Sequence, residues 1–172
     1  DRLNERVGRG VYWLVLVAVV VSAVNAIVRK VFNYSSNAFL EAQWYLFSAI
    51  FLLCAGYTLL RNEHVRIDVV AGRFSRRTQA WIDILGTLFF LFPWLAILAV
   101  TSAPFVLSSW GIRESSATAD GMPGLYLLKS LLWVLCALLF VQGLALIARR
   151  SLYLAGHGIV DHDEDKVTDE RL

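Results

Sequence analysis

Four long apolar runs alternate with short charged segments along the chain. Each run is long enough to cross a bilayer, because a helix needs about 20 mostly apolar residues to span the hydrocarbon core. Inside lipid a backbone can pair only with itself, so such runs cross the membrane as helices. The pattern predicts an all-α integral membrane protein with a four-helix domain over residues 1–150 and a polar cytoplasmic tail over 151–172, its transmembrane helices covering about residues 11–28, 38–60, 79–107 and 125–148.

The third run is longer than a bilayer requires. It contains Pro93 and Pro104. At about 1.5 Å per residue a helix over this run exceeds the hydrocarbon thickness, so we expect it to tilt, kink near Pro93 or project beyond the membrane. Pro104 is expected to mark its fraying end.

The segment between the second and third runs, residues 62–79, has its own pattern. Its apolar residues follow the i, i+3, i+4, i+7 spacing of a one-sided helix. The spacing predicts a short amphipathic helix lying in the membrane interface. A strand over 65–69 is the alternative, disfavoured because a lone strand leaves its backbone unpaired. The residues assigned to the interfacial helix are His64, Arg66, Asp68, Arg73 and Phe74.

Composition and charge agree with a lipid-embedded protein. Hydrophobic residues make up 58% of the chain and charged residues 17%, too little polar surface for a water-soluble domain. The net charge of +2 is too small to indicate nucleic-acid binding. Ten Lys and Arg residues flank the helices on the side of the termini and four on the other side, which predicts that both termini are cytoplasmic. The first run has the features of a retained helix, not of a cleaved signal peptide.

The residue types that support catalysis are missing from the spans. His64, His157 and His162 lie outside the apolar runs, which excludes the paired intramembrane histidines of a membrane haem protein. No phosphate-binding glycine loop, nucleophile elbow or zinc-protease motif is present. Cys54 and Cys136 have no metal or redox spacing and are read as small packing residues. We expect no enzyme activity, no metal and no cofactor.

Glu41 is the main ionisable residue at membrane depth. It lies about one turn inside the second helix, where the helix N-terminus favours negative charge. Three roles are open to it: a subunit contact, a proton relay, or a carboxylate that only reaches the interface. Gln43 and Asn25 are expected to hydrogen-bond between helices.

The connection before the fourth helix, residues 108–124, is the longest exposed loop on the outer side. It could dock a periplasmic partner, or it could be a solvated connector. The candidate docking residues are Trp110, Arg113, Glu114 and Asp120.

Two stretches resemble a known family. Residues 35–69 read SSNAFLEAQWYLFSAIFLLCAGYTLLRNEHVRIDV, and residues 75–94 read SRRTQAWIDILGTLFFLFPW. A Glu with aromatic neighbours early in helix two, followed by AGYTLLR and HVRID, resembles the small membrane subunit of TRAP (tripartite ATP-independent periplasmic) transporters, of the DctQ type. The similarity covers nearly the whole chain apart from the charged tail.

The resemblance implies partners and a role. A periplasmic binding protein would deliver an organic acid to a large membrane subunit, which would carry it inward with sodium across the bacterial inner membrane. The small subunit would scaffold the large one in the bilayer. By position, the helix-two motif would serve assembly and the HVRID motif membrane positioning. The assembly residues are then Glu41, Gln43, Trp44 and Tyr45.

Two other functions remain as alternatives to this one. The chain could anchor an unrelated membrane complex, which would show a different partner. It could also be a self-sufficient small channel or transporter, for which Asn25, Glu41 and Gln43 are the candidate path-lining residues. The absence of an internal repeat with interrupted helices disfavours a complete transporter.

Overall fold

The computed structural model describes residues 2–33, 36–60, 74–118 and 121–156, and every regular secondary-structure element among them is a helix. Four helices in this part of the chain are long and apolar enough to cross a membrane. They are α1 (Arg2–Val31), α2 (Asn37–Leu60), the continuous helix Arg76–Gly111, and α6 (Leu125–Leu154). The four predicted spans are confirmed. The segment assigned to an interfacial helix lies mostly outside the described residues, as do His64, Arg66, Asp68 and Arg73.

The helices are longer than the apolar runs that predicted them. α1 begins nine residues before the expected start at Val11, and α6 continues past residue 150 to Leu154. Pro104 does not end the third helix, which continues to Gly111. Polar residues at both ends thus extend the helices past the part that lipid would cover, because backbone hydrogen bonding continues beyond the apolar run.

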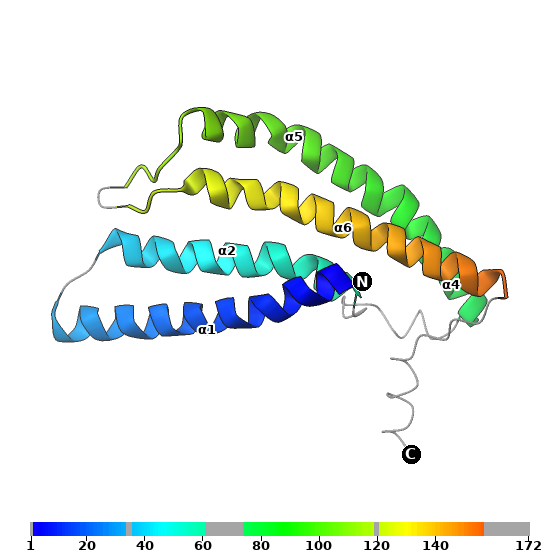
Figure 1. The fold of residues 1–172 in the computed structure, drawn as a ribbon, viewed down its shortest axis with the longest axis horizontal. Coiled ribbons are helices and arrows are strands. Elements are labelled where there is room, and N and C mark those ends of the chain that lie inside the picture. The colour runs from blue at the N-terminus through cyan, green and yellow to red at the C-terminus, as the bar shows by residue number, and fades with distance from the viewer. Residues whose placement is uncertain (1, 34–35, 61–73, 119–120, 157–172) are drawn as a thin grey trace, which may run out of the picture.

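The helices lie side by side in the order α1, α2, α6, α5 (Figure 1). α2 and α6 run in the same direction as neighbours, and α1 and α5 (Phe92–Gly111) run opposite to them at the two edges. We call the end with the connections 32–36 and 112–124 the loop end. The opposite end, where α1 begins and α6 ends, is the terminal end.

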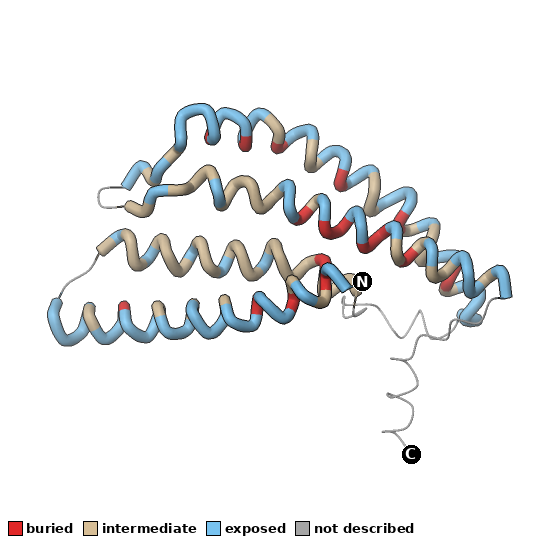
Figure 2. Tube along the Cα trace, in the orientation of Figure 1, coloured by how far each residue is buried: buried red, intermediate tan, exposed pale blue. Residues whose placement is uncertain are grey.

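This arrangement encloses only a small core. Leu95, Leu135 and Leu139 form its centre, and partly buried apolar residues of α2, η1 and α5 pack around them. Buried positions concentrate on α6 and on the start of α1, whereas the outer helices are mostly exposed (Figure 2). A membrane protein tolerates such a thin core because lipid or a partner, not water, covers the remaining apolar surface.

The third span contains one wide helical turn. It consists of α4 (Arg76–Gly86), the π-helical turn η1 (Thr87–Leu91) and α5. Pro93, at the start of α5, has no N–H to return to the preceding turn, and the Phe92 N–H bonds the Thr87 carbonyl five residues back. The expected irregularity near Pro93 is therefore a π turn just before the proline.

Two glycines set how closely the helices approach. A Cβ on Gly56 of α2 would lie 2.5 Å from Asn4 Oδ1 and 3.2 Å from Leu138 Cβ. A Cβ on Gly143 of α6 would lie 2.7 Å from Phe92 Cε1. Small residues at helix contacts are a common means of association in membranes, since they let backbones come together.

Candidate functional site

Glu41 is fixed by the loop that precedes α6. Its Oε1 accepts hydrogen bonds from the hydroxyls of Ser116 and Thr118, and its Oε2 accepts one from the Met122 N–H at 2.7 Å. The loop also closes on itself, because the Ser116 N–H donates to the Met122 carbonyl at 3.2 Å. The carboxylate therefore holds the connection 112–124 against the first turns of α2.

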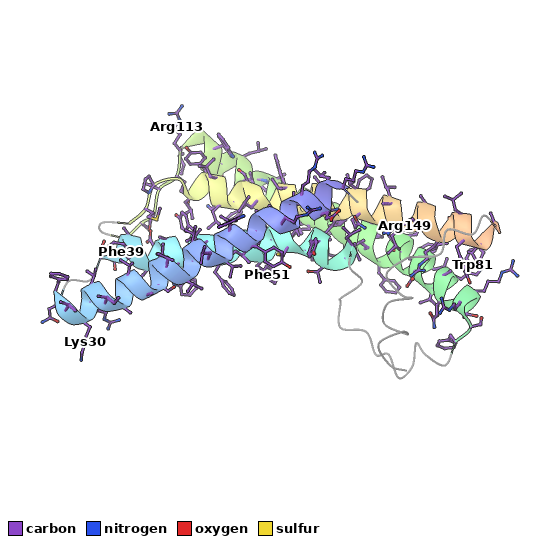
Figure 3. All side chains as sticks on the ribbon, turned by 60° about the horizontal axis from the view of Figure 1, so that its bottom comes forward. Lys30, Phe39, Phe51, Trp81, Arg113 and Arg149 are labelled. Atoms are coloured by element: carbon purple, nitrogen blue, oxygen red, sulfur yellow. The ribbon has the colours of Figure 1, made fainter. Side chains whose placement is uncertain are left out.

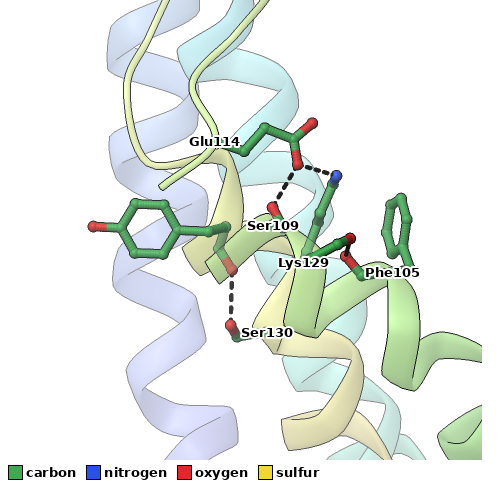
Figure 4. A network of polar contacts seen from close by, with 7 residues as sticks. Phe105, Ser109, Glu114, Lys129 and Ser130 are labelled. Atoms are coloured by element: carbon green, nitrogen blue, oxygen red, sulfur yellow. Dashed lines mark hydrogen bonds and ion pairs between the residues drawn. The ribbon is translucent and has the colours of Figure 1, made fainter. Parts of the chain in front are cut away.

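Glu114 forms a second carboxylate centre at the loop end, drawn in Figure 4. It accepts hydrogen bonds from Ser109 Oγ at 2.6 Å and from Lys129 Nζ. The Lys129 ammonium also lies 4.0 Å from the centroid of the Phe105 ring, within the range of a cation–π contact. The hydrogen bonds from Lys129 and Ser109 hold the pKa of Glu114 below its usual value, because they favour the charged form.

Trp110 is engaged within the chain as well. Its indole N–H donates to Ser130 Oγ at 2.6 Å, and its ring meets the Tyr126 ring edge-on with centroids 4.8 Å apart. These contacts attach the end of α5 to the start of α6. Of the candidate docking residues, Trp110 and Glu114 thus have internal partners, and Asp120 lies outside the described residues.

Arg113 differs from both of these residues. It follows the last turn of α5 with φ of 47°, a left-handed conformation that normally favours glycine. Its N–H donates to the Trp110 carbonyl at 3.3 Å, which closes the helix end. Its side chain is exposed and points away from the helices (Figure 3). For a residue with a side chain, this conformation costs roughly 1–2 kcal/mol.

An exposed aromatic face runs along α2. Trp44, Phe47 and Phe51 are 73%, 72% and 70% exposed, and Leu40 one turn earlier is 38% exposed. The four residues are spaced by four, three and four positions, so they line one side of the helix. We call them the α2 outer face; Phe51 is labelled in Figure 3.

The four assembly candidates therefore point in different directions. Trp44 lies on the α2 outer face, and Glu41 is turned to the loop. Gln43 is half-buried, and the Tyr45 hydroxyl is buried without a hydrogen-bond partner among the described residues. Only Trp44 among them offers a large surface to another protein.

The terminal end is held by contacts between helices. Asn4 is fully buried, and its Nδ2 donates to Gln142 Oε1 at 2.9 Å. Arg150 Nε donates to Asp83 Oδ2 at 3.1 Å, joining α6 to α4. Phe74, the one described residue among the five assigned to the interfacial helix, is exposed just before the Ser75 cap of α4.

Sequence reasoning missed most of these partners. Asp83 of α4, for example, contacts Arg150 of α6 across 67 positions. Asn4 lies before the first apolar run, so hydrophobicity alone does not indicate its burial. A polar residue spaced in register with Gly8 and Val11, which are also buried, was the available signal.

No group of three or more potential metal ligands occurs in the described ranges. The described residues thus form a loop held by hydrogen bonds, an exposed aromatic face on α2 and polar contacts between helices. These features suit association with another membrane protein.

The comparisons with known proteins agree with this membrane architecture. A family model described as "Tripartite ATP-independent periplasmic transporters, DctQ component" matches residues 11–152. No curated protein and no solved structure matches the chain.

Proposed function

Since the chain belongs to the DctQ family, the small membrane component of TRAP transporters, we propose that it scaffolds the large transport subunit in the bilayer. The family is a transporter component and not an enzyme family. In this proposal the large subunit moves an organic acid with sodium, and a periplasmic binding protein supplies that acid. The small subunit contributes position and stability to the assembly.

The α2 outer face is the observation that carries the proposal. α2 lies between α1 and α6 (Figure 1), and most of its residues are only partly buried within the chain. Three of its exposed residues, Trp44, Phe47 and Phe51, are aromatic side chains on one line. Aromatic residues are enriched at the centre of protein interfaces, and the 4-3-4 spacing suits packing against another helix.

The same proposal includes an orientation. The excess of Lys and Arg lies at the terminal end, so we place both termini in the cytoplasm and the loop end in the periplasm of the bacterial inner membrane. In that orientation the connection 112–124 faces the soluble binding protein. Residues 62–73 would follow α2 on the cytoplasmic side, where the proposed amphipathic helix would lie in the interface.

The channel alternative has less support. It needs Glu41 free to line a path shared by copies of the chain. Both Glu41 oxygens accept hydrogen bonds from the chain's own loop, which favours an assembly or loop-holding role. The membrane-anchor alternative differs only in the identity of the partner, so it is decided by purification.

The test is purification of tagged protein from native membranes in a gentle detergent. We expect a large membrane protein in stoichiometric amount. The double variant Trp44→Ala/Phe47→Ala should reduce its recovery at least tenfold, because truncating interface aromatics removes the largest contacts.

The matched control is Trp13→Ala/Phe90→Ala, which removes one Trp and one Phe of similar exposure from α1 and η1. Its recovery should equal that of the unchanged protein. Recovery of the chain alone as a stable oligomer would contradict the scaffold proposal. Loss of the partner with the control but not with the α2 variant would contradict the assignment of the face.

A further inference from the structure

Exposed charge at the loop end has one sign in the described residues. The two carboxylates there, Glu41 and Glu114, are turned to donors of their own chain. Arg29, Lys30 and Arg113 are exposed instead, and no ion pair joins them to another described residue. We call these three cations the loop-end rim. Among the described residues, the exposed charge at this end is therefore positive.

The rim is spread across the layer. Arg29 and Lys30 lie in the last turn of α1 at one edge, and Arg113 follows α5 at the other (Figure 3). Neighbouring helix axes are about 8–10 Å apart, so three helix spacings separate the edges by roughly 24–30 Å. A standard protein interface of about 800 Å² per partner has a similar width. One lipid headgroup could not bridge the rim.

Arg113 adds an independent observation. It holds a left-handed backbone conformation at a helix end where glycine is the favoured residue. Strained positions that retain a side chain cluster at functional sites. The charge of Arg113 is therefore placed outward despite a backbone cost.

We propose that the loop-end rim binds an acidic surface on a soluble periplasmic protein and speeds its association with the transporter. The proposal rests on the orientation given under the proposed function, which places the loop end in the periplasm. Complementary charge at an interface mainly raises the association rate and its dependence on salt. The rim would thus act when the binding component arrives.

The test measures association of the transporter's own soluble binding component with the purified membrane complex. The complex is held in nanodiscs of zwitterionic phosphatidylcholine, and rates are recorded at low and high ionic strength. The variant Arg29→Glu/Lys30→Glu/Arg113→Glu should lower the association rate constant at least tenfold at low salt. It should also flatten the salt dependence.

The control variant is Arg2→Glu/Arg6→Glu/Arg77→Glu, which makes the same charge change with exposed cations of the terminal end. It should change the rate less than twofold. An equal drop in both variants would overturn the proposal, since only total charge would then matter. A rim effect seen only in nanodiscs that contain phosphatidylglycerol would also overturn it, in favour of lipid binding.

Arg113→Gly separates charge from structure. Glycine suits the left-handed backbone, so this variant should slow association without lowering the thermal midpoint. If association were unchanged in this variant and in the triple reversal, and the complex still contained its large subunit, the binding role of the loop-end rim would be contradicted. The scaffold proposal would not be affected. Absence of a large subunit from the unchanged complex would instead contradict the scaffold proposal.

Discussion

The two ends of the helix layer are held together in different ways. At the terminal end, the Asn4–Gln142 bond and the Asp83–Arg150 pair each join residues of different helices that are far apart in sequence. At the loop end, Glu114 bonds to groups within 15 positions of it, and Glu41 of α2 bonds to the connection before α6, 75 to 81 positions away, and not to another helix. The terminal end therefore determines how helices pack, whereas the loop end determines the shape of an exposed surface.

The largest expected effect is at the terminal end. Gly56→Ala places a Cβ 2.5 Å from Asn4 Oδ1, and overpacking of this kind costs typically 1–3 kcal/mol. The thermal midpoint in detergent should fall. Gly10→Ala is the control, because nothing lies within 4 Å of its Cβ. A Gly56→Ala midpoint equal to that of the control would show that Asn4 does not fix the approach of α1 to α2.

The Asp83–Arg150 pair should have the next largest effect. Their side chains are only 11% and 22% exposed, and hydrogen bonds to charged groups contribute roughly 1.5–3 kcal/mol. A double-mutant cycle with Asp83→Ala and Arg150→Ala should give a coupling energy of about 1–2 kcal/mol. The Arg9–Glu5 pair, exposed and four positions apart, is the comparison. A coupling energy no larger than that of Arg9–Glu5 would show that the Asp83–Arg150 pair does not stabilise the terminal end.

Glu41→Ala tests the loop end. It removes the acceptor of three hydrogen bonds from the connection 112–124. We expect several-fold faster hydrogen exchange and proteolysis in that connection, with little change in the thermal midpoint of the helices. Glu5→Ala at the terminal end is the control. A large fall in the thermal midpoint without faster hydrogen exchange in the connection would contradict the difference proposed between the two ends.

Acidification gives the smallest expected effect. The pKa of Glu114 is held below its usual value by Lys129 and Ser109. A carboxyl group whose pKa is lowered in the folded state contributes stability above its unfolded pKa, about 4.3, and this contribution is lost as pH falls through the folded pKa. The thermal midpoints of the unchanged protein and of Glu114→Gln, recorded against pH, should therefore converge as the pH falls through the folded pKa of Glu114. A constant difference between them at all pH values would contradict the role of the charge.

The sequence predicts the number of membrane helices because lipid imposes a strong length requirement on apolar runs. It predicts their ends poorly: α1 begins at Arg2 because helical hydrogen bonding continues through polar residues whose burial depends on α2 and α6. The Glu41 contacts illustrate the same limit. The helix position of Glu41 follows from the pattern, but its partners are 75 to 81 positions away, and only the parallel packing of α2 and α6 brings them together.

The direction of the α2 side chains was also beyond sequence reasoning. Trp44 and Tyr45 are neighbours in one motif, yet one is exposed and the hydroxyl of the other is buried. Periodicity alone places two faces on a helix that is apolar all round and does not say which face meets a neighbour. The packing of α2 between α1 and α6 decides this.

The most direct measurement of the scaffold claim is photo-cross-linking in native membranes. A photoreactive phenylalanine analogue replaces Phe47 on the α2 outer face or, as the control, Trp13 on α1. Both positions are exposed, at 72% and 69%. We expect a cross-linked product with a larger membrane protein from the Phe47 position and none from the Trp13 position. A protein product from Trp13, with the Phe47 position giving none, would contradict the claim that the α2 outer face holds the large subunit.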